Sequence, residues 1–361
     1  MILLYLNDGE MGNYLESIQS SYHITITEDI DFYCSATDFK KKIAICNERR
    51  IGQLTKNIDI ANKLKPVSDL VVFELGEMMY TEVIDTTIND NMHYLIPGFL
   101  NKYDPKKFIF LPNFFIEMNN FYKELPQVLE LLEPYSTKPY CFDALLGTKK
   151  THRDFIYQRY LASEHQNKIL INYRETDIVE DRSMPLSSSS NYFWEPGTTN
   201  NTDITYSGHI VKFHNLSMPA SSVLPILSVY NKSAYSIVAE TAYHPESPVF
   251  YTEKTVKPIL ARRLFIVFTA KNFLAGLKKV GFKTFDNVID ESYDAVDDDQ
   301  ERWAQAFKQI EYLCTQEQSV VLEKIKPIVE HNYQLLTNTD WRRNALMHLS
   351  ALVEDVIKTK A

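Results

Sequence analysis

The chain has 361 residues, of which 45% are hydrophobic, and its 47 acidic and 38 basic side chains give a formal charge of −9. These values exclude a wholly disordered chain, and they argue against a protein that binds nucleic acid mainly through its overall positive field. The length is sufficient for two domains, and the small number of glycines, 10 in all, argues against collagen-like and glycine-repeat architectures.

Short apolar runs between polar or turn residues predict six strands in the first part of the chain. They are Ile2–Leu6, His23–Thr27, Ile43–Cys46, Leu70–Phe73, His93–Ile96 and Phe108–Leu111. Runs that are apolar on both faces favour a parallel sheet covered by helices. The polar segment that ends at Pro139 predicts a domain boundary near residue 135.

The strand pattern begins again after this boundary, with predicted strands at Tyr140–Leu146, Ile169–Tyr173, Ser236–Ala239 and Leu264–Phe268. A helix is predicted at Arg153–Ser163. The polar stretch Asp181–Asp203 is a long loop, either a functional lid or a loop held to the core by its aromatic residues. Near the end, Trp303, Phe307, Ile310 and Cys314 recur at helical spacing after Asp297–Asp299, and Leu346, Leu349, Val353 and Val356 do so in a final helix.

These elements predict an α/β protein of two Rossmann-like domains, residues 1–135 and 136–340, with a closing helix over residues 341–361. Four widely spaced cysteines without metal-ligand spacing favour reduced thiols. The N-terminal residues lack a basic leader, and no apolar run approaches the ~18–20 residues of a membrane span. A cytoplasmic protein is therefore expected.

The segment with the strongest chemical signal combines a buried strand that ends at Glu240 with a helix that begins near Thr252. Thr252 stands at a helix N-cap position, ahead of Glu253, Lys254 and Lys257. A helix N-terminus attracts phosphate, and lysines in its first turn are unfavourable unless an anion lies over them. The carboxylate at the strand end could accept hydrogen bonds from ribose. A capped helix with solvated lysines remains the alternative.

The stretch FYTEKTVKPILARRLFIVF, Phe250–Phe268, resembles the nucleotide-sugar-binding region of GT-B glycosyltransferases. It is most similar to the Tyr-x-Thr-Glu-Lys element of the fucosyltransferase-like type, with Phe250 at the Tyr position. Bacteriophage DNA glucosyltransferases share this strand–loop–helix arrangement. The resemblance covers roughly residues 235–295, with weaker support from residues 140–160. It implies two Rossmann-like domains facing across a cleft and a nucleoside-diphosphate sugar as donor, with no required cofactor.

The resemblance implies that acidic residues contact the ribose or the sugar and that basic residues contact the diphosphate. Glu253 and Lys254 match the motif itself, whereas Glu240 and Lys257 match it by position. Arg153, in the first loop and helix of the second domain, is the expected further phosphate ligand because a guanidinium can bind two phosphate oxygens at once. An ordinary ion pair of Arg153 with Asp154 or a neighbour remains open.

A catalytic base for transfer to a hydroxyl is expected on the first domain. Glu74 and Glu77 follow an apolar strand, at the sheet edge where ligands collect in open α/β sheets. Asp8 and Glu10 follow the first strand in the same way and are the rival candidates. Further candidates are His93, His209 and His214. No metal site is predicted, because Asp297–Asp299 is typical of a helix N-terminus.

The sequence therefore predicts a hexosyl- or pentosyltransferase that acts on a glycan or on a hydroxymethylated base in phage DNA, in the host cytoplasm if phage-encoded. Lys40–Lys42, Arg49–Arg50, Lys102 and Lys106–Lys107 could form a cationic rim for DNA, although ordinary solvated charges are the alternative. A non-catalytic protein that binds a nucleotide sugar or a glycan is the competing function. No Walker or GxGxxG motif is present, and the oligomeric state is not assigned.

Overall fold

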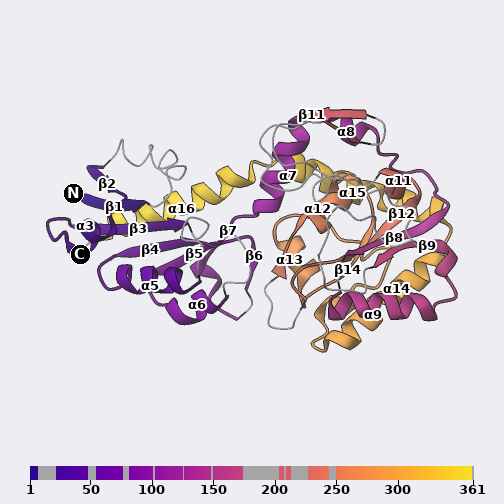
Figure 1. The fold of residues 1–361 in the computed structure, drawn as a ribbon, viewed down its shortest axis with the longest axis horizontal. Helices are drawn as coiled ribbons and strands as arrows, with labels where there is room; N and C mark the ends of the chain where they lie inside the picture. The colour runs from indigo at the N-terminus through magenta and orange to yellow at the C-terminus, as the bar shows by residue number, and fades with distance from the viewer. Residues whose placement is uncertain are drawn as a thin grey trace. The chain divides into compact units, whose positions relative to one another are not determined.

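The computed structural model describes residues 1–6, 22–47, 54–75, 81–100, 102–124, 126–147, 149–173, 203–206, 209–212, 227–243 and 249–359. The chain forms two compact units, one of Met1–Asn113 with Asp340–Ala361 and one of Phe114–Thr339. In Figure 1 the first unit is coloured indigo to purple, with its C-terminal helix in yellow, and the second unit is coloured magenta to orange-yellow. The sequence-based domain limits stay a prediction.

The first unit is built on a parallel sheet with the strand order β2-β1-β3-β4-β5-β7. Its strands are β1 (Ile2–Leu6), β2 (Ile24–Thr27), β3 (Lys41–Asn47), β4 (Leu70–Glu74), β5 (Met92–Ile96) and β7 (Phe108–Phe110), with a short β6 (Gly98–Phe99). Its helices are α3 (Ile30–Ser35), α5 (Leu54–Leu64), α6 (Thr81–Thr87) and α16 (Trp341–Lys358). The six strands predicted for this part of the chain are confirmed.

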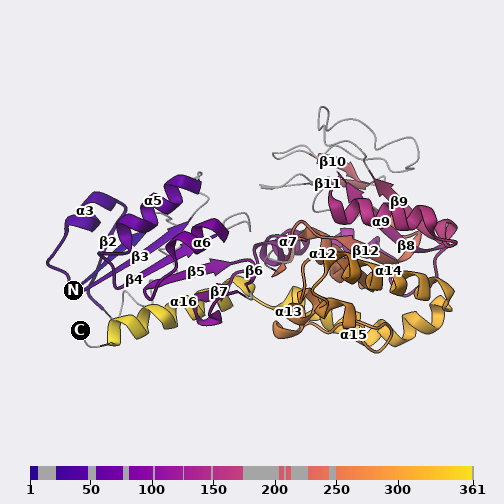
Figure 2. The same ribbon diagram turned by 90° about the horizontal axis from the view of Figure 1, so that it is seen from below.

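Helices cover both faces of this sheet, which explains why its central strands are apolar on both sides. Figures 1 and 2 show α5 and α6 on one face and α16 on the other. All of Leu70–Phe73 in β4 is buried. Such continuous apolar runs are typical of parallel strands covered on both faces.

The C-terminal helix α16 belongs to the first unit. The Asp340 side chain accepts a hydrogen bond from the backbone N–H of Arg343 and so caps the helix start. The Trp341 ring packs edge-on against Phe110 of β7, with ring centroids 6.5 Å apart. The predicted final helix is confirmed, and its apolar stripe, which includes Leu346 and Val353, is buried.

The second unit holds a parallel sheet with the strand order β14-β12-β8-β9. These strands are β8 (Tyr140–Gly147), β9 (Ile169–Tyr173), β12 (Ser233–Ala239) and β14 (Phe265–Phe268), and all four were predicted. The unit also contains β13 (Val249–Phe250) and the antiparallel pair β10 (Asp203–Tyr206) and β11 (His209–Lys212). Its helices are α7 (Asn113–Glu124), α8 (Pro126–Glu130), α9 (Thr151–Ala162), α11 (Leu227–Tyr230), α12 (Glu253–Leu260), α13 (Phe273–Lys279), α14 (Asp299–Thr315) and α15 (Gln318–Asn338).

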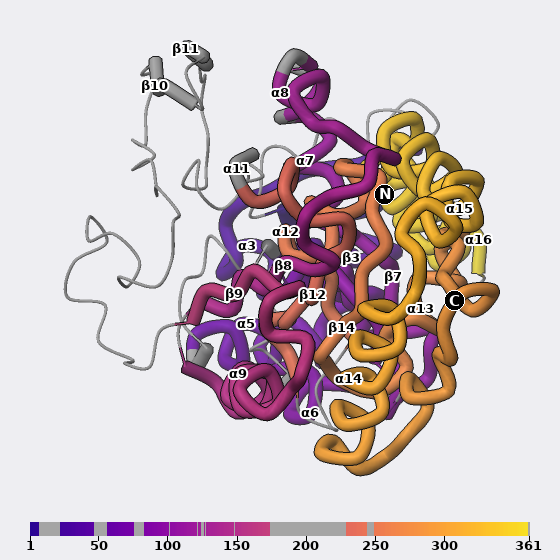
Figure 3. The backbone as a smooth tube through the Cα atoms, turned by 90° about the vertical axis from the view of Figure 1, so that its right-hand side faces the viewer, coloured from indigo at the N-terminus to yellow at the C-terminus, as the bar shows by residue number. Residues whose placement is uncertain are grey.

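Helices lie on both faces of this sheet as well. Figures 1 and 3 show α9 and α14 on one side and α12 and α15 on the other. The predicted helix start at the acidic run is confirmed, because Asp298 caps α14 by accepting from the backbone N–H of Glu301 at 2.8 Å. The predicted loop at Asp181–Asp203 lies outside the described residues, apart from Asp203, which begins β10. The predicted architecture of two α/β, Rossmann-like units with helices at the C-terminus is confirmed.

The order of the strands creates a topological switch point between β8 and β12. From β8 the chain runs to β9 on one side, and it later returns to β12 on the other side of β8. The connections that leave β8 and β12 therefore diverge. In open α/β sheets this divergence leaves a crevice at the carboxyl ends of the two strands, where ligands bind.

A buried ion pair joins β8 and β12 to the turn before β14. Nη2 of Arg263 donates to Oδ2 of Asp143 at 2.7 Å, and both side chains are almost wholly buried. The hydroxyls of Ser233 and Ser236 donate to the same carboxylate oxygen, and Arg263 also donates to the backbone oxygen of Tyr235. Burial raises the pKa of Asp143, although Arg263 and the serine hydroxyls oppose that rise. The sequence pattern did not predict this pair.

Candidate functional site

The site begins at the turn between β8 and α9, at the carboxyl end of β8. Gly147 adopts a left-handed φ of +65°, a backbone conformation that glycine accepts without strain. A Cβ at Gly147 would lie 3.4 Å from Nη1 of Arg153, which shows that the guanidinium lies against this turn. The arginine itself is held in the first turn of α9 and is 6% exposed.

Electrostatic interactions link Arg153 to the segment that follows β12. Burial lowers the pKa of Arg153, whereas Glu240, Glu253 and Tyr243 oppose this change. Lys150, the residue before α9, reaches the backbone oxygen of Thr241, with its Nζ at 3.4 Å. Burial also lowers the pKa of Lys150, and the neighbouring charges of Arg153 and Lys254 lower it further. The start of α9 and the segment from Glu240 to Lys254 therefore form a single cluster of charges.

The predicted helix N-cap at Thr252 is confirmed. Its side chain accepts a hydrogen bond from the backbone N–H of Lys254 at 3.3 Å, and its own backbone is extended. Nζ of Lys254 lies 2.6 Å from Oε1 of Glu253 and 3.4 Å from Oγ1 of Thr241. Lys254 thus lies over the amino end of α12, beside the loop that follows β12.

Glu240 is completely buried and organises the start of α12. Its two carboxylate oxygens accept hydrogen bonds from the backbone N–H groups of Thr241 and Thr252 and from the hydroxyls of Thr252 and Thr255. Burial raises the pKa of Glu240, while Lys254 and the threonine hydroxyls oppose that rise. These bonds occupy the carboxylate from within the protein, which favours a positioning role. A contact of Glu240 with ribose stays a prediction.

Replacing Thr255 with valine is expected to lower the free energy of unfolding by about 1–2 kcal/mol, because the buried Glu240 carboxylate loses one donor. Valine keeps the shape of threonine and has no hydroxyl. Urea unfolding of Thr255→Val and of Thr255→Ser measures the effect, and serine, which retains the hydroxyl, should recover most of the loss. An unchanged free energy of unfolding in Thr255→Val, or a larger loss in Thr255→Ser than in Thr255→Val, would show that the methyl group of Thr255 matters more than its hydroxyl.

Glu253 and Lys257 influence each other electrostatically, one helical turn apart on α12. Burial would raise the pKa of Glu253, but Lys254 and Lys257 outweigh it and the net shift is downward. Burial lowers the pKa of Lys257, and Glu253 opposes this change. The charged carboxylate of Glu253 thus holds Lys254 at the start of α12 and attracts Lys257, which lies in the last turn of this helix.

Together these residues form an anion-binding arrangement at the switch point of the sheet. The backbone N–H groups at the amino ends of α9 and α12 are not used within their helices, and both ends carry the positive pole of a helix dipole. Cationic side chains outnumber carboxylates in the cluster by two, which matches a diphosphate. The cations are Lys150, Arg153, Lys254 and Lys257, and the carboxylates are Glu240 and Glu253.

The predicted ligands of this site are thus neighbours in space, whereas the predicted base is in the other unit. Glu74 is the last residue of β4, at the carboxyl edge of the first sheet, and is partly buried. Glu77, Asp8, Glu10 and His214 lie outside the described residues, and of His209 only the backbone, at the start of β11, is described. The imidazole of His93 lies within β5, where burial and Lys107 lower its pKa. The role of each stays a prediction.

Sequence reasoning did not assign Lys150 to the site, because a lysine in a polar turn is usually solvated. Lys149 behaves in that way and is exposed, with its Nζ 3.9 Å from Asp154. Lys150 instead points to Thr241 in the loop after β12. The signal in the sequence that could have assigned Lys150 to the site is its position immediately before the first residue of α9, where a helix N-terminus attracts anions.

Four of the lysines considered for a DNA-binding rim, Lys41, Lys42, Lys102 and Lys107, bond to partners in their own unit. Lys41 pairs with Asp69 at 3.3 Å, and Lys102 pairs with Asp85 at 3.0 Å. Lys42 is buried and donates to the backbone oxygen of Ala36. Arg49 and Arg50 lie outside the described residues. These contacts favour ordinary structural and solvated charges.

Within the described parts of the chain, no three His, Cys, Asp or Glu side chains are grouped as metal ligands. The helices described there include none with the length and apolar character needed to span a membrane.

A comparison with solved structures finds similarity to a chain described as "Crystal Structure of alpha1,3-Fucosyltransferase". The match covers 100% of this chain and 90% of that chain, with a TM-score of 0.40 and 10% sequence identity. No protein-family model matches the chain, and no curated protein matches it. The assignment of roles to residues therefore rests on the site itself.

Proposed function

We propose that the chain is a GT-B glycosyltransferase that binds a nucleoside-diphosphate sugar at the switch point of the second unit. The observation that carries this proposal is the convergence of two helix N-termini with Lys150, Arg153, Lys254 and Lys257 at the carboxyl ends of β8 and β12. Diphosphate is the ligand whose charge and oxygen atoms match this arrangement. The FYTEK element lies at the same site and supports the same donor class.

Each charged residue then has a distinct role. Arg153 and Lys254 bind the diphosphate, with the guanidinium contacting two oxygens and the ammonium contacting one. Lys150 and Lys257 add positive charge around it. Glu253 holds Lys254 in place and is the candidate contact to the ribose or the sugar, while Glu240 and Thr252 position the start of α12.

During transfer, the acceptor oxygen bonds to the anomeric carbon while the bond from that carbon to the diphosphate breaks. Negative charge develops on the departing nucleoside diphosphate, where Arg153, Lys254 and the helix N-termini stabilise it. A carboxylate of the first unit removes the proton from the acceptor hydroxyl, and Glu74 and Glu77 are the proposed bases. The acceptor is a hydroxyl compound, a glycan or a hydroxymethylated base.

A screen of nucleoside diphosphates and nucleotide sugars by thermal shift tests the donor class, because a ligand that binds the folded state raises its melting temperature. Slow release of free nucleotide from the stabilising sugar donor, without an acceptor, then separates a transferase from a non-catalytic binding protein. Stabilisation without hydrolysis or transfer would favour the binding protein. No stabilisation by any nucleotide would contradict the proposal.

Replacing Lys254 or Arg153 with alanine is expected to weaken nucleoside-diphosphate binding about 10–150-fold, because each change removes a charged hydrogen bond to phosphate. Isothermal titration calorimetry measures the affinity, with thermal unfolding as the check on folding. Lys308→Ala is the matched control, since Lys308 is an exposed lysine on α14. Unchanged affinity in both site variants, with folding intact, would assign these cations to solvated or structural roles.

A further inference from the structure

A cavity of about 540 Å³ opens in the second unit, among α7, α8, the end of α15 and Arg262, which lies two residues past the end of α12. This volume lies in the range of small-molecule sites. Arg262 comes directly before Arg263 and β14, at the amino end of that strand, whereas the diphosphate site lies at the carboxyl ends of β8 and β12. The cavity is therefore a separate place on the same unit.

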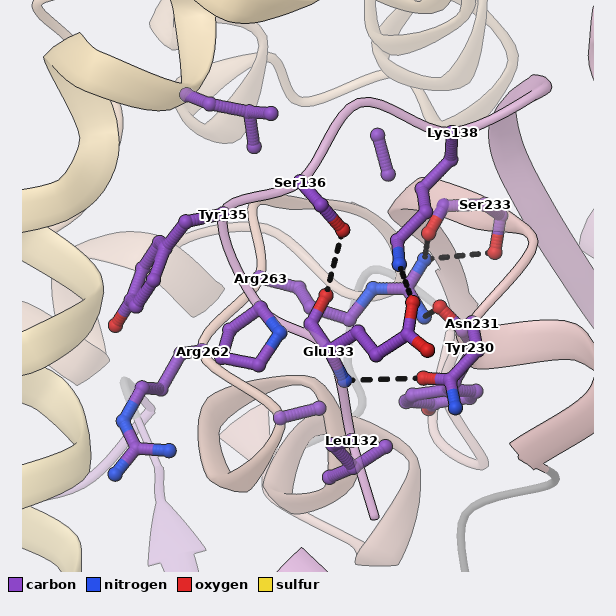
Figure 4. Close-up of a pocket in the computed structure, with 14 residues that line it drawn as sticks. Leu132, Glu133, Tyr135, Ser136, Lys138, Tyr230, Asn231, Ser233, Arg262 and Arg263 are labelled. Carbon is purple, nitrogen blue, oxygen red and sulfur yellow. Dashed lines mark hydrogen bonds and ion pairs between the residues drawn. The ribbon is translucent and has the colours of Figure 1, made fainter. Parts of the chain in front are cut away.

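Arg262 is the feature that marks this cavity as more than a gap in packing. Its φ is +53°, in the left-handed region just past the end of α12, where glycine is the usual residue. A side chain at such a position costs backbone energy, and such outliers gather at binding sites. The neighbouring Arg263 turns into the core. Figure 4, which draws a different pocket that shares Arg262 with this cavity, shows the two guanidinium groups pointing in opposite directions.

The guanidinium of Arg262 is held rigidly in the cavity wall. Its face lies over the Tyr333 ring, 3.6 Å from the centroid, and its Nε lies 3.3 Å from Oε1 of Glu330. The hydroxyl of Tyr135 donates to the same oxygen of Glu330. Nε of Arg262 is buried and has no hydrogen-bond partner among the described residues, so Glu330 contacts the guanidinium as an ion pair, and the outer Nη atoms form the edge that can bind a carboxylate.

The rest of the wall is suited to a hydroxylated ligand of low charge. Glu330 neutralises part of the Arg262 charge, and Glu130 opposes Lys123, so the cavity has little excess positive charge. A monoanion matches this balance better than a phosphate dianion. The wall also contains the amides of Asn119, Gln334 and Asn338 and the hydroxyl of Thr337. Thr337 donates to the backbone oxygen of Tyr333 and Asn338 donates to Oε1 of Gln334, which leaves the Gln334 amide N–H groups and the Thr337 oxygen lone pairs for a ligand. Amides and hydroxyls of this kind bind sugar hydroxyls.

We propose that this cavity binds a hydroxylated carboxylate of the uronic-acid type, with the free edge of the Arg262 guanidinium contacting the carboxylate. This site is independent of the diphosphate site. It gives the protein a second small-molecule specificity, directed at acidic sugars.

The test is a titration by ligand-observed NMR with D-glucuronate, methyl glucoside and glucose 6-phosphate as probes. Glucuronate is expected to bind more tightly than either of the others. Arg262→Gly, which suits the left-handed backbone, and Arg262→Lys, which keeps the charge without the planar edge, should each weaken glucuronate at least about tenfold. Arg159→Lys, at an exposed arginine of α9, is the matched control and should leave binding unchanged.

Lys254→Ala, at the diphosphate site, should also leave glucuronate binding unchanged, which separates this proposal from the proposed donor site. The inference is overturned if glucuronate does not bind, if methyl glucoside or the sugar phosphate binds as well or better, or if folded Arg262 variants bind normally. Equal weakening by Lys254→Ala would place the probe at the diphosphate site and would also overturn it. Thermal unfolding of each variant establishes that it is folded.

Discussion

Replacing Glu74 with glutamine is expected to lower the rate of sugar transfer about 10²–10⁴-fold, while the affinity for the nucleoside diphosphate stays unchanged. Glutamine keeps the size and the hydrogen-bonding reach of glutamate, but it cannot take a proton at neutral pH. Glu74 ends β4 at the carboxyl edge of the first sheet, the edge at which ligands bind in open α/β sheets, and the topological switch point of this sheet lies between β1 and β3. Initial rates of transfer and calorimetric affinities, measured on the same preparation, test this expectation.

Glu77→Gln should be measured beside it, because Glu77 follows the same strand and is the second candidate. Asp8→Asn and Glu10→Gln serve as the rivals at the end of β1. Full activity in both the Glu74 and the Glu77 variants would move the base to another residue. A loss of nucleotide affinity equal to the loss of rate would show a binding role for the substituted carboxylate.

Replacing Arg263 with methionine is expected to lower the free energy of unfolding by about 3–5 kcal/mol. The substitution leaves the buried Asp143 carboxylate without its guanidinium partner, and burial is already the main cause of the raised pKa of Asp143. Urea unfolding followed by circular dichroism measures the change. Arg159→Met, at the surface, is the control and should shift stability by less than about 0.5 kcal/mol.

The loss in Arg263→Met should also depend on pH. Without the arginine the pKa of Asp143 rises further in the folded state, so the folded state binds this proton more tightly than the unfolded chain does. The stability that such a group contributes is present at low pH and is lost as pH rises through its folded pKa. The deficit relative to the wild type should therefore shrink between pH 7 and pH 5, and the double variant Asp143→Asn/Arg263→Met should recover part of it. A deficit that is the same at both pH values would assign the loss to packing.

Local patterns were sufficient for the strands of the two main sheets and for the helices α9, α12, α14 and α16, whereas the longest described helix, α15, was not predicted. The apolar runs of β4 and β12 are buried on both faces, so their composition alone separates them from the amphipathic helices. The N-cap at Thr252 and the acidic start of α14 follow from side-chain chemistry within one turn of helix. The hairpin β10–β11 was not predicted, because its strands are short and lie in a polar part of the chain.

Such local patterns could not predict which residues of distant segments contact one another. Lys150 and Lys149 are neighbours with the same chemistry, yet only Lys150 reaches Thr241, which is 91 residues away. Arg262 and Arg263 are likewise adjacent, and only the folded chain sends one to Asp143 and the other to Tyr333. The direction in which each side chain of such a pair points depends on the backbone conformation at that residue and on the segments that pack beside it.

By itself the sequence determined the α/β class, the strands of the two main sheets and the capped start of α12, because each of these depends on the chemistry of a few consecutive residues. The tertiary structure alone decided that β8 and β12 are neighbours at a switch point, which brings Arg153 and Lys254 into one cluster. It also decided that the Glu240 carboxylate is turned inward to the threonines of α12 and that Arg262 lines a second cavity. Strand order and side-chain direction follow from packing over the whole unit, and no single segment contains that information.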